Sequence, residues 1–469
     1  MGERFDVAVV GGGMGGYVAA IRAAQLGLKV ALIEEDKVGG TCLHRGCIPT
    51  KVLLQTAALL DELGRSDTLG VTTEGVGLDY ATVGRRRAEI VGQLHRGVIH
   101  LLKKNRVTTI AGRGRIAGSG RVAVHGAGER EGQEQELESQ EVIIATGSRP
   151  RALPGVAVDG RHILTSDEAV TLDHVPRSAV VIGAGAVGVE FASFYRSCGA
   201  EVTLVEMAER LVPLEDHEVS RELRRGFEGR GIRCLTKATV DTGSISLNEG
   251  GVELSVSAED REERLQSEVL LLAAGRAANV DGAGLESAGV SLENGFVTVD
   301  GMLSTAAPGV KAIGDLVGGF LLAHKAMYEG VIAAEAIAGR EPQPLDPRRI
   351  TRTTYCSPEI ASMGLSEEQA RDTGHEVAVG RMPFRANGRA LIWGHPGGMC
   401  KIVSDAKTKD VLGVHFIGHE VTELIYGPAL GALLEATPFE ISRAVAPHPT
   451  LTEVITEAAA AVGGDAIHI

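Results

Sequence analysis

Two cysteines, Cys42 and Cys47, are separated by only four residues in a segment rich in small side chains. Thiols this close in sequence can close into a disulfide and open again, which moves two electrons. The other four cysteines are scattered along the chain, so no second close pair would complete a zinc site. The pair therefore indicates a redox-active dithiol, with two unconnected free thiols as the alternative.

The segment around these cysteines could continue as one helix over residues 41–54. Cys42 would then lie in the first turn, where the helix dipole stabilises a thiolate. Residues five apart in an ideal helix have Cα atoms about 8–9 Å apart, whereas a disulfide needs less than about 7 Å. A bond between the two sulfurs therefore requires a distorted turn.

A histidine and a glutamate near the C-terminus, His448 and Glu453, are candidates for the base that thiol exchange needs. A carboxylate that holds an imidazole fixes its tautomer and raises its basicity, and histidine titrates near neutral pH. The spacing alone is a weak signal, because most of the 14 histidines are expected at the surface or in packing.

The elements that must position these residues form two copies of one pattern. An apolar strand, a glycine-rich turn, a helix and a second strand that ends in an acid occur over 5–34 and again over 179–206. The acid follows the first glycine at the same interval in both copies. The motif residues are Gly11, Gly13, Gly16 and Glu34 in the first copy, and Gly183, Gly185, Gly188 and Glu206 in the second.

This spacing is typical of dinucleotide binding. The first glycine makes a tight turn, the second lets the backbone approach a pyrophosphate, and the third lets the helix pack close to the strand. The pyrophosphate lies at the helix N-terminus, and the acid accepts hydrogen bonds from a ribose. One such motif is weak evidence, but two predict two dinucleotide sites. Glu206 would repel a 2′-phosphate and favours NAD over NADP, although Arg210 stands close by.

The rest of the chain is consistent with a globular protein of several domains. Its 469 residues suggest about three domains, and a formal net charge of −14 argues against nucleic acid as a partner. No apolar run approaches the ~20 residues of a membrane span, and residues 1–6 do not resemble a secretory signal. Six cysteines are too few and too scattered for a disulfide framework, so a cytoplasmic protein is expected.

Several segments outside the two copies also carry local signals. Residues 106–140 are expected to form a β-meander with a solvated acidic hairpin, followed by a buried strand and a small-residue turn over 141–148. Further strands are expected at 270–276 and at 310–315, where the last residue is acidic. A proline-rich link over 341–347 begins the final region of mixed strands and helices.

In the order in which these motifs occur, the chain resembles the flavoprotein disulfide reductases over essentially its whole length. The resemblance rests on the two glycine motifs with their acids, the cysteine pair, Ala145-Thr146-Gly147, Ala312-Ile313-Gly314-Asp315, and His448 with Glu453. It implies an α/β fold with two three-layer, Rossmann-like dinucleotide-binding domains and a C-terminal α+β dimerisation domain. The implied parts are an FAD-binding domain at 1–148, an NAD-binding domain at 149–275, a central domain completing the FAD site at 276–346 and an interface domain at 347–469.

The resemblance also implies FAD at the first motif and NAD at the second. Asp315 would hold the flavin ribitol, Gly114 would lie against the adenosine, and Lys51 would pair with Glu190 near the flavin ring. Cys42 would meet the substrate and Cys47 the flavin. The implied FAD residues are Gly11, Gly13, Gly16, Glu34, Thr41, Lys51, Gly114, Thr146, Gly147, Asp315 and Ala323, and the implied NAD residues are Gly183, Gly185, Gly188, Glu190, Glu206 and Gly275.

Within this family the chain is most similar to the lipoamide branch. Leu43 and Ile48 stand where the glutathione branch usually has valine, and Ala186 stands where it usually has tyrosine. The C-terminus lacks the cysteine pair of mercuric reductases. The implied reaction oxidises protein-bound dihydrolipoamide with NAD+ as acceptor. A disulfide reductase of the glutathione or mycothiol type and a non-catalytic flavoprotein subunit are the alternatives.

The resemblance implies a homodimer in which His448 of one subunit reaches the disulfide of the other. The implied partners are lipoyl domains of the acyltransferase component of 2-oxo acid dehydrogenase complexes, or of the glycine cleavage system. Neither nucleic acid nor membrane is expected. One departure lies between the cysteines, where His44 and Arg45 replace a more usual Asn-Val. We expect this pair to alter the surroundings of the disulfide.

Overall fold

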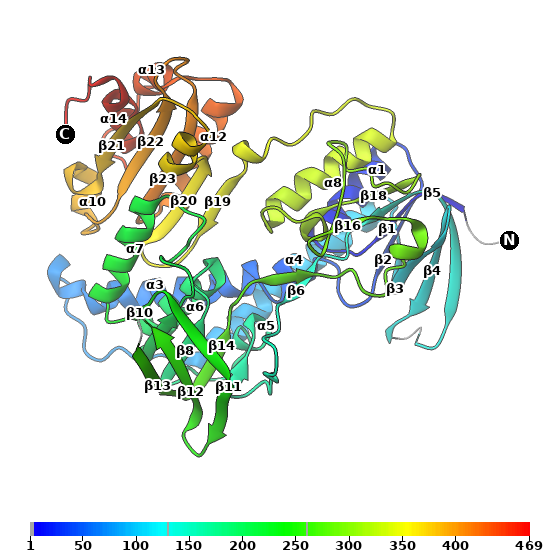
Figure 1. The fold of residues 1–469 in the computed structure, drawn as a ribbon, viewed down its shortest axis with the longest axis horizontal. Coiled ribbons are helices and arrows are strands. Elements are labelled where there is room, and N and C mark those ends of the chain that lie inside the picture. Colours follow the sequence, from blue (N-terminus) through cyan, green and yellow to red (C-terminus); the bar gives the residue numbers. More distant parts are fainter. Residues whose placement is uncertain (1–3, 129–130, 259–260) are drawn as a thin grey trace. The chain divides into compact units, whose positions relative to one another are not determined.

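The structure is a computed structural model that describes residues 4–128, 131–258 and 261–469 (Figure 1). Parts of three predicted segments therefore lie outside the described residues: the first three residues of the FAD-binding domain, 129–130 of the acidic hairpin and 259–260 of the NAD-binding domain. Contacts divide the chain into two compact units. Unit 1 comprises Met1–Val52, Ala81–Arg151 and Arg276–Leu345, and unit 2 comprises Leu53–Tyr80, Ala152–Gly275 and Asp346–Ile469.

Unit 1 is built on a parallel sheet whose strands are buried because both faces are covered. Its order is β18 (Val310–Ala312), β5 (Glu134–Ile144), β1 (Arg4–Val10), β2 (Val30–Glu34) and β3 (Thr108–Gly118). Helices α1 (Met14–Gln25) and α8 (Ala323–Ile337) pack closely together. Glycine makes this approach possible, because a Cβ on Gly330 would lie 2.5 Å from the Gly15 carbonyl oxygen. Helix α4 (Tyr80–Lys104) completes this unit.

The predicted meander is formed by β3, β4 (Arg121–Gly126) and β5, which pair antiparallel. The buried strand and small-residue turn predicted over 141–148 are confirmed, because the strand ends at Ile144 and residues 145–147 leave it. Residues 134–144 form one continuous strand that pairs with β4 in its first half and with β1 in its second half. The acidic tract therefore belongs largely to the sheet. Exposed and buried residues alternate along the first half of β5, so its charged side chains point to solvent.

Two short strands join the middle of unit 1. Strand β6 (Ser148–Pro150) pairs antiparallel with β15 (Arg276–Ala278), so segments far apart in sequence meet there. A small hairpin of β16 (Leu292–Glu293) and β17 (Phe296–Val297) follows. This pairing places the residues after Gly147 beside those after Gly275.

Unit 2 contains a second parallel sheet. Its order is β10 (Arg233–Leu235), β9 (Glu201–Val205), β8 (Ser178–Ile182), β14 (Val269–Leu272) and β7 (Ile163–Leu164). The helices of this region are α5 (Ser166–Ala169), α6 (Ala186–Ser197) and α7 (His217–Gly229). An antiparallel sheet of β11 (Ala238–Asn248), β12 (Gly251–Ala258) and β13 (Arg261–Ser267) packs beside the parallel one. Both copies of the sequence pattern are thus strand–turn–helix–strand units.

The C-terminal part of unit 2 is an antiparallel sheet covered by helices. The strand order is β19 (Thr351–Thr354), β20 (Glu359–Gly364), β23 (Val411–Gly418), β22 (Met399–Asp405) and β21 (Val377–Pro383). Helix α14 (Glu453–Gly463) packs on β21 and β22, and a Cβ on Gly380 would lie 1.9 Å from the Ala458 carbonyl oxygen. The other helices are α9 (Glu367–Asp372), α10 (Gly388–Ile392), α11 (Val421–Leu424), α12 (Tyr426–Leu433) and α13 (Pro438–Arg443). The predicted fold class is therefore confirmed.

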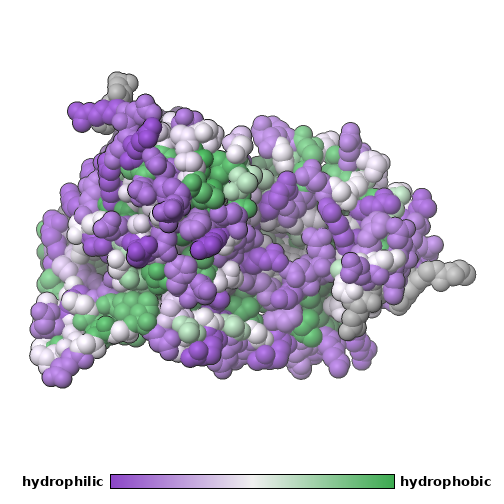
Figure 2. Space-filling model, turned by 90° about the horizontal axis from the view of Figure 1, so that it is seen from below, coloured by the Kyte–Doolittle hydropathy of each residue, from purple (hydrophilic) through white to green (hydrophobic). Residues whose placement is uncertain are grey.

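The surface carries both polar and apolar regions. Figure 2 shows a mostly hydrophilic face on which hydrophobic residues gather in separate patches. Exposed apolar side chains of the C-terminal region include Leu430, Leu433, Leu434 and Phe439. Across the described residues, the helices are all too short or too polar to cross a membrane.

Candidate active site

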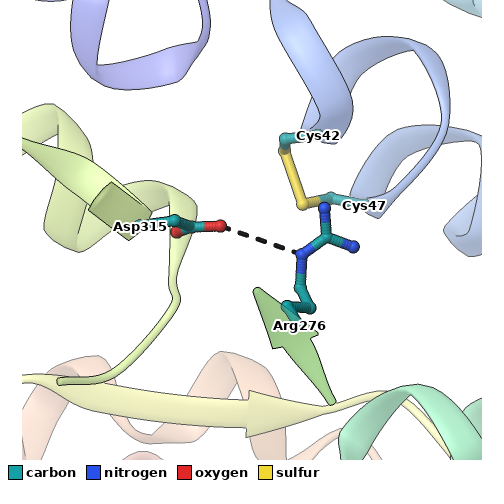
Figure 3. Close-up of a disulfide and its surroundings, with 4 residues drawn as sticks. All are labelled: Cys42, Cys47, Arg276 and Asp315. Carbon is teal, nitrogen blue, oxygen red and sulfur yellow. Dashed lines mark ion pairs between the residues drawn. A yellow bond between two sulfur atoms is a disulfide. The ribbon is translucent and has the colours of Figure 1, made fainter. Parts of the chain in front are cut away.

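Cys42 and Cys47 are joined by a disulfide (Figure 3). Cys42 lies on the short helix α2 (Gly40–His44), and Cys47 begins the longer helix α3 (Cys47–Gly64). An unbroken helix over 41–54, which would hold the sulfurs too far apart, does not form, because the backbone leaves the helical conformation at Arg45. The break brings the two Cα atoms to 4.6 Å, within the range that a disulfide requires. The distorted turn expected from the spacing is thus confirmed.

The disulfide segment is fixed directly to the first glycine turn. The Gly39 N–H donates to the Gly12 carbonyl oxygen at 2.8 Å. Gly40 has a φ of +59°, and a Cβ there would lie 2.7 Å from the Gly13 Cα. Only glycine accepts both this conformation and this approach. The dithiol therefore lies close to the place where a dinucleotide would bind.

The first glycine turn has the geometry that a pyrophosphate needs. Gly11 has a φ of +101°, and a Cβ on Gly16 would lie 1.9 Å from the Gly11 carbonyl oxygen. A Cβ on Gly13, by contrast, would meet nothing within 4 Å. Gly13 caps α1 without a side-chain hydrogen bond, so the first N–H groups of the helix can serve an anion.

The acid of this motif contacts the turn itself. Glu34 accepts the Gly12 N–H at 2.6 Å and the Asp36 N–H at 2.9 Å. Burial raises the pKa of Glu34, although the two N–H donors act in the opposite direction. The carboxylate therefore lies at the end of β2, beside the turn, where a ribose would meet it.

The second glycine turn repeats this geometry. A Cβ on Gly188 would lie 1.8 Å from the Gly183 carbonyl oxygen, whereas a Cβ on Gly185 would meet nothing within 4 Å. Glu206 accepts the N–H groups of Ala184 and Ala208, both at 2.7 Å. Gly185 caps α6 without a side-chain hydrogen bond. Residues of both turns thus fit a dinucleotide.

Arg210 was the residue that weighed against NAD at the second turn. Its guanidinium forms an ion pair with Glu368 at 3.0 Å. A carboxylate already neutralises this cation, and the buried Glu206 carboxylate lies at the end of β9. The charge arrangement of the second turn therefore favours a ribose without a 2′-phosphate.

Asp315 lies next to two residues that sequence reasoning missed, Ser148 and Arg276. The Ser148 hydroxyl donates to the Asp315 carboxylate, and the Arg276 Nε lies 3.9 Å from the same carboxylate. Arg276 also donates to the Ser148 hydroxyl at 2.7 Å and to its carbonyl oxygen at 2.8 Å. Figure 3 shows Arg276 extending from β15 toward the disulfide, with Asp315 on its other side. The only sequence signal was the position of Arg276 directly after the predicted Gly275.

Thr146 and Gly147 are held by another residue that the sequence did not indicate, Asn279. The Thr146 hydroxyl donates to the Asn279 carbonyl oxygen at 2.8 Å, and the Asn279 amide donates to the Thr146 carbonyl oxygen at 2.9 Å. The Asn279 N–H donates to the Gly147 carbonyl oxygen at 2.9 Å. These bonds fix the turn after β5, where Gly147 has a φ of +69°.

The remaining predicted cofactor residues are placed but their roles stay predictions. Thr41 lies on α2, Lys51 on α3 and Ala323 at the start of α8. Gly114 lies on β3, where a Cβ would come within 3.0 Å of a Val10 methyl group. Gly275 has a φ of +98° just before β15. Glu190 is buried on α6 and accepts the Tyr355 N–H at 2.9 Å. Its ion pair with Lys51 stays a prediction.

His448 and Glu453 form the hydrogen bond expected from their sequence. Glu453 accepts from the His448 Nδ1 at 2.8 Å and from the Thr450 N–H at 2.9 Å. Partial burial raises the pKa of Glu453, but these two donors outweigh it and the pKa lies below its usual value. The His448 side chain is 79% exposed, so the imidazole is accessible to another molecule.

Two dinucleotide-type turns and a disulfide fixed to the first of them define a nucleotide-dependent disulfide oxidoreductase. Comparison with known families agrees. Residues 5–330 match the family model described as pyridine nucleotide-disulphide oxidoreductase, and residues 350–459 match the dimerisation domain of the same family. The chain belongs to this family.

Individual relatives match over the full length of the chain. The dihydrolipoyl dehydrogenases of Bacillus subtilis and Zymomonas mobilis are each 44% identical, with 100% of both chains covered. Among solved structures, LpdA from Mycobacterium tuberculosis has a TM-score of 0.89 and 29% identity, covering 97% of this chain and 98% of its own. The HOCl-induced flavoprotein disulfide reductase RclA from Escherichia coli has a TM-score of 0.84 and 25% identity, covering 97% and 99%.

Proposed function

We propose that this protein is a dihydrolipoyl dehydrogenase. It oxidises protein-bound dihydrolipoamide to lipoamide through the Cys42–Cys47 disulfide and FAD, and it reduces NAD+ to NADH. The observation that carries the proposal is the disulfide fixed to the first dinucleotide turn, in a chain that matches dihydrolipoyl dehydrogenases from end to end.

The two turns divide the cofactors between them. FAD is assigned to the turn of Gly11, Gly13 and Gly16, with Glu34 on its ribose and Asp315 on its ribitol. NAD is assigned to the turn of Gly183, Gly185 and Gly188, with Glu206 on its ribose. When bound, FAD carries the two electrons of the dithiol to NAD+. The protein contributes the close placement of the dithiol and the first turn.

Thiol exchange begins at Cys42. The first substrate thiol gives its proton to His448 of the partner subunit, and the resulting thiolate attacks the Cys42 sulfur. The bond between the two cysteines breaks, a mixed disulfide with Cys42 forms, and Cys47 leaves as a thiolate. The second substrate thiol attacks the substrate sulfur of this mixed disulfide, and its proton ends on the departing Cys42 sulfur. Lipoamide then leaves with its disulfide closed, Cys42 is a thiol and Cys47 stays a thiolate. Two electrons have then moved from the substrate to the cysteine pair.

The base comes from a second copy of the chain. The C-terminal region carries the dimerisation domain of the family, and the family supports a homodimer. His448 is highly exposed on this region and oriented by Glu453. A twofold dimer would then contain two equivalent sites, each built from both subunits.

The partners are lipoyl domains of a 2-oxo acid dehydrogenase complex or of the glycine cleavage system. This assignment follows from the substrate, because dihydrolipoamide is carried on such domains. A cytoplasmic location fits the four remaining cysteines, Cys198, Cys234, Cys356 and Cys400, which are free thiols.

Steady-state assays test the reaction. Purified protein reconstituted with FAD is expected to reduce NAD+ with dihydrolipoamide, and to prefer NAD+ to NADP+. Oxidised glutathione and a mycothiol disulfide, each supplied with NADH or NADPH, serve as competing substrates. A faster reaction with either disulfide would assign the protein to that branch. No turnover with any of them would favour a non-catalytic flavoprotein subunit.

A further inference from the structure

The turn between Cys42 and Cys47 is held in place by the side chain of His44. Leu43 is 4% exposed and packs in the core of unit 1, whereas the next side chain, His44, turns toward the segment after β2. The His44 Nε2 lies 2.9 Å from the Val38 carbonyl oxygen. A carbonyl only accepts, so this nitrogen carries the proton and donates. The segment that separates Cys42 from Cys47 is therefore bound to residue 38.

A second contact fixes the neighbouring residue to the same place. The Arg45 guanidinium forms an ion pair with the Asp36 carboxylate, and both side chains are half-exposed. Asp36 and Val38 lie two and four residues after Glu34, the acid of the first dinucleotide motif. Two consecutive side chains of the turn thus reach one short segment beside the FAD motif.

A second histidine supports the first. His95 on α4 donates from Nδ1 to the same Val38 oxygen at 3.0 Å, and its ring lies edge-on to that of His44 with the centroids 5.0 Å apart. One oxygen therefore receives two imidazole donors from two different elements. This arrangement depends on His44, one of the two residues that depart from the family pattern.

We propose that His44, with Arg45 and His95, is a positioning residue for the cysteine pair. The three side chains clamp the turn in the conformation that brings the sulfurs together, and they thereby favour the disulfide over the dithiol. The inference rests on the proposed redox role of Cys42 and Cys47. It adds a determinant of the thiol–disulfide equilibrium of that pair.

The direction follows from what each redox state requires. The disulfide holds the Cα atoms 4.6 Å apart, whereas two separate thiols are larger than a bonded pair and push the turn apart. Hydrogen bonds that fit the closed turn are therefore worth more in the disulfide than in the dithiol. Losing the clamp makes the pair easier to reduce.

A purely structural role for His44 makes a different prediction. Val38 keeps the His95 donor when His44 is lost, so its carbonyl oxygen stays hydrogen-bonded and the stability of the fold changes little. A clamp, by contrast, shifts the thiol–disulfide equilibrium. The two roles separate when both quantities are measured on one variant.

The experiment equilibrates the holoenzyme anaerobically with mixtures of reduced and oxidised dithiothreitol. The enzyme disulfide takes two electrons and two protons from reduced dithiothreitol, which closes to its cyclic disulfide. Acid quenching, alkylation of free thiols and mass spectrometry then give the reduced fraction of Cys42 and Cys47. Wild type is compared with His44→Leu, His44→Gln and Arg45→Met, and His125→Leu is the matched control. His125 is half-exposed in the same unit and pairs with Glu134, away from the redox turn.

We expect His44→Leu to lower the equilibrium constant for disulfide formation about fivefold, the effect of one hydrogen bond of about 1 kcal/mol. Arg45→Met should lower it by about twofold, because an exposed ion pair contributes less. His44→Gln, whose amide can reach the same oxygen, should recover most of the loss, and His125→Leu should match wild type. The thermal midpoint should stay close to that of wild type in all four.

Each other outcome has a defined meaning. Equal constants in wild type, His44→Leu and Arg45→Met would overturn the clamp. If His44→Leu does not fold, the decision passes to His44→Gln and Arg45→Met: a constant for Arg45→Met equal to that of wild type overturns the proposal. A wild-type pair that dithiothreitol cannot reduce would instead contradict the proposed function, because no redox cycle would then exist.

Discussion

At the scale of single residues, the proposed reaction depends on His448 as its base. Its hydrogen bond to Glu453 leaves the opposite ring nitrogen to accept a substrate proton, since the carboxylate holds the proton on Nδ1. The lowered pKa of Glu453 keeps that carboxylate charged at neutral pH. A charged partner stabilises the imidazolium that forms when the thiol is deprotonated.

We therefore expect His448→Gln to lower dihydrolipoamide turnover about 10²–10⁴-fold, the usual contribution of a general base. Reduction of the bound flavin by NADH should be unchanged, because it does not need this proton transfer. Steady-state assays and anaerobic stopped-flow absorbance measure the two reactions. The matched control is His468→Gln, since His468 forms the same type of bond to Glu457 at 2.9 Å. Near-normal turnover of His448→Gln would remove His448 as the base.

The clamp at His44 leads to a prediction on pH. Burial, and then the nearby His95 and Lys37, lower the pKa of His44, while the Val38 carbonyl oxygen and Asp36 act in the opposite direction. A base with a lowered pKa in the folded protein is stabilised in its neutral form. Its contribution to the free energy of unfolding is therefore present at neutral pH and is lost as the pH falls below about 6.5, the ordinary value.

His44 should therefore contribute less to folding stability as the pH falls. We expect the free energy of unfolding of wild type, relative to that of His44→Leu, to decrease as the pH is lowered from about 8 to about 5. Chemical denaturation at each pH measures this difference. His44→Gln has no titrating group at this position and should keep a constant difference from His44→Leu. Parallel curves for all three proteins would contradict a role for imidazole protonation.

At the scale of elements, the break between α2 and α3 brings the two cysteines within disulfide distance. In each glycine turn, some glycines are needed for close packing and another leaves space for a ligand. Gly183 and Gly188 are needed for packing, because a Cβ on either would lie within 2.5 Å of a carbonyl oxygen. Gly185 is different: its side faces open space. That space is where the pyrophosphate of NAD is expected.

Gly185→Ala should therefore weaken nucleotide binding without harming the fold. We expect the dissociation constant for NADH to rise about tenfold or more, equivalent to at least about 1.4 kcal/mol, because a methyl group blocks the approach of the phosphates. The thermal midpoint should stay close to that of wild type. Titration calorimetry and a thermal melt provide the two readings, and Gly229→Ala is a control with equally open surroundings. Unchanged NADH affinity would show that the phosphates bind elsewhere.

At the scale of the whole molecule, the proposed site needs two copies of the chain. His448 lies on the C-terminal region of unit 2, and the disulfide lies in unit 1. In a homodimer with shared sites, a subunit without its base can still offer its disulfide to the base of the other subunit.

Complementation tests this arrangement. His448→Gln and Cys47→Ser dimers are each expected to be inactive, but a heterodimer would contain one site with both native residues. After dissociation and random reassociation of equal amounts, activity should recover to about one quarter of wild type, since half of the dimers are mixed and each has one working site. Size-exclusion chromatography confirms that dimers have re-formed. Mixed dimers without activity would mean that each chain carries a complete site.

The sequence by itself determined the two dinucleotide motifs, the redox pair and the pairing of His448 with Glu453. These features are local: a glycine is required wherever backbone approaches backbone, and its spacing follows the geometry of one strand, turn and helix. The break at Arg45 was also implied, because an unbroken helix holds the sulfurs too far apart. The residue at which α2 ends was not implied by the sequence, because the capping signals there are weak.

Only the tertiary structure decided which distant residues join these motifs. Ser148 and Arg276 meet because β6 pairs with β15, and His95 reaches the Val38 oxygen because α4 packs in the core of unit 1. Such contacts are set by strand register and helix packing, which depend on the whole core and leave no fixed interval in the sequence. The cysteine pair and the unusual His44 and Arg45 could thus be found in the sequence, whereas their contacts with Val38 and Asp36 could not.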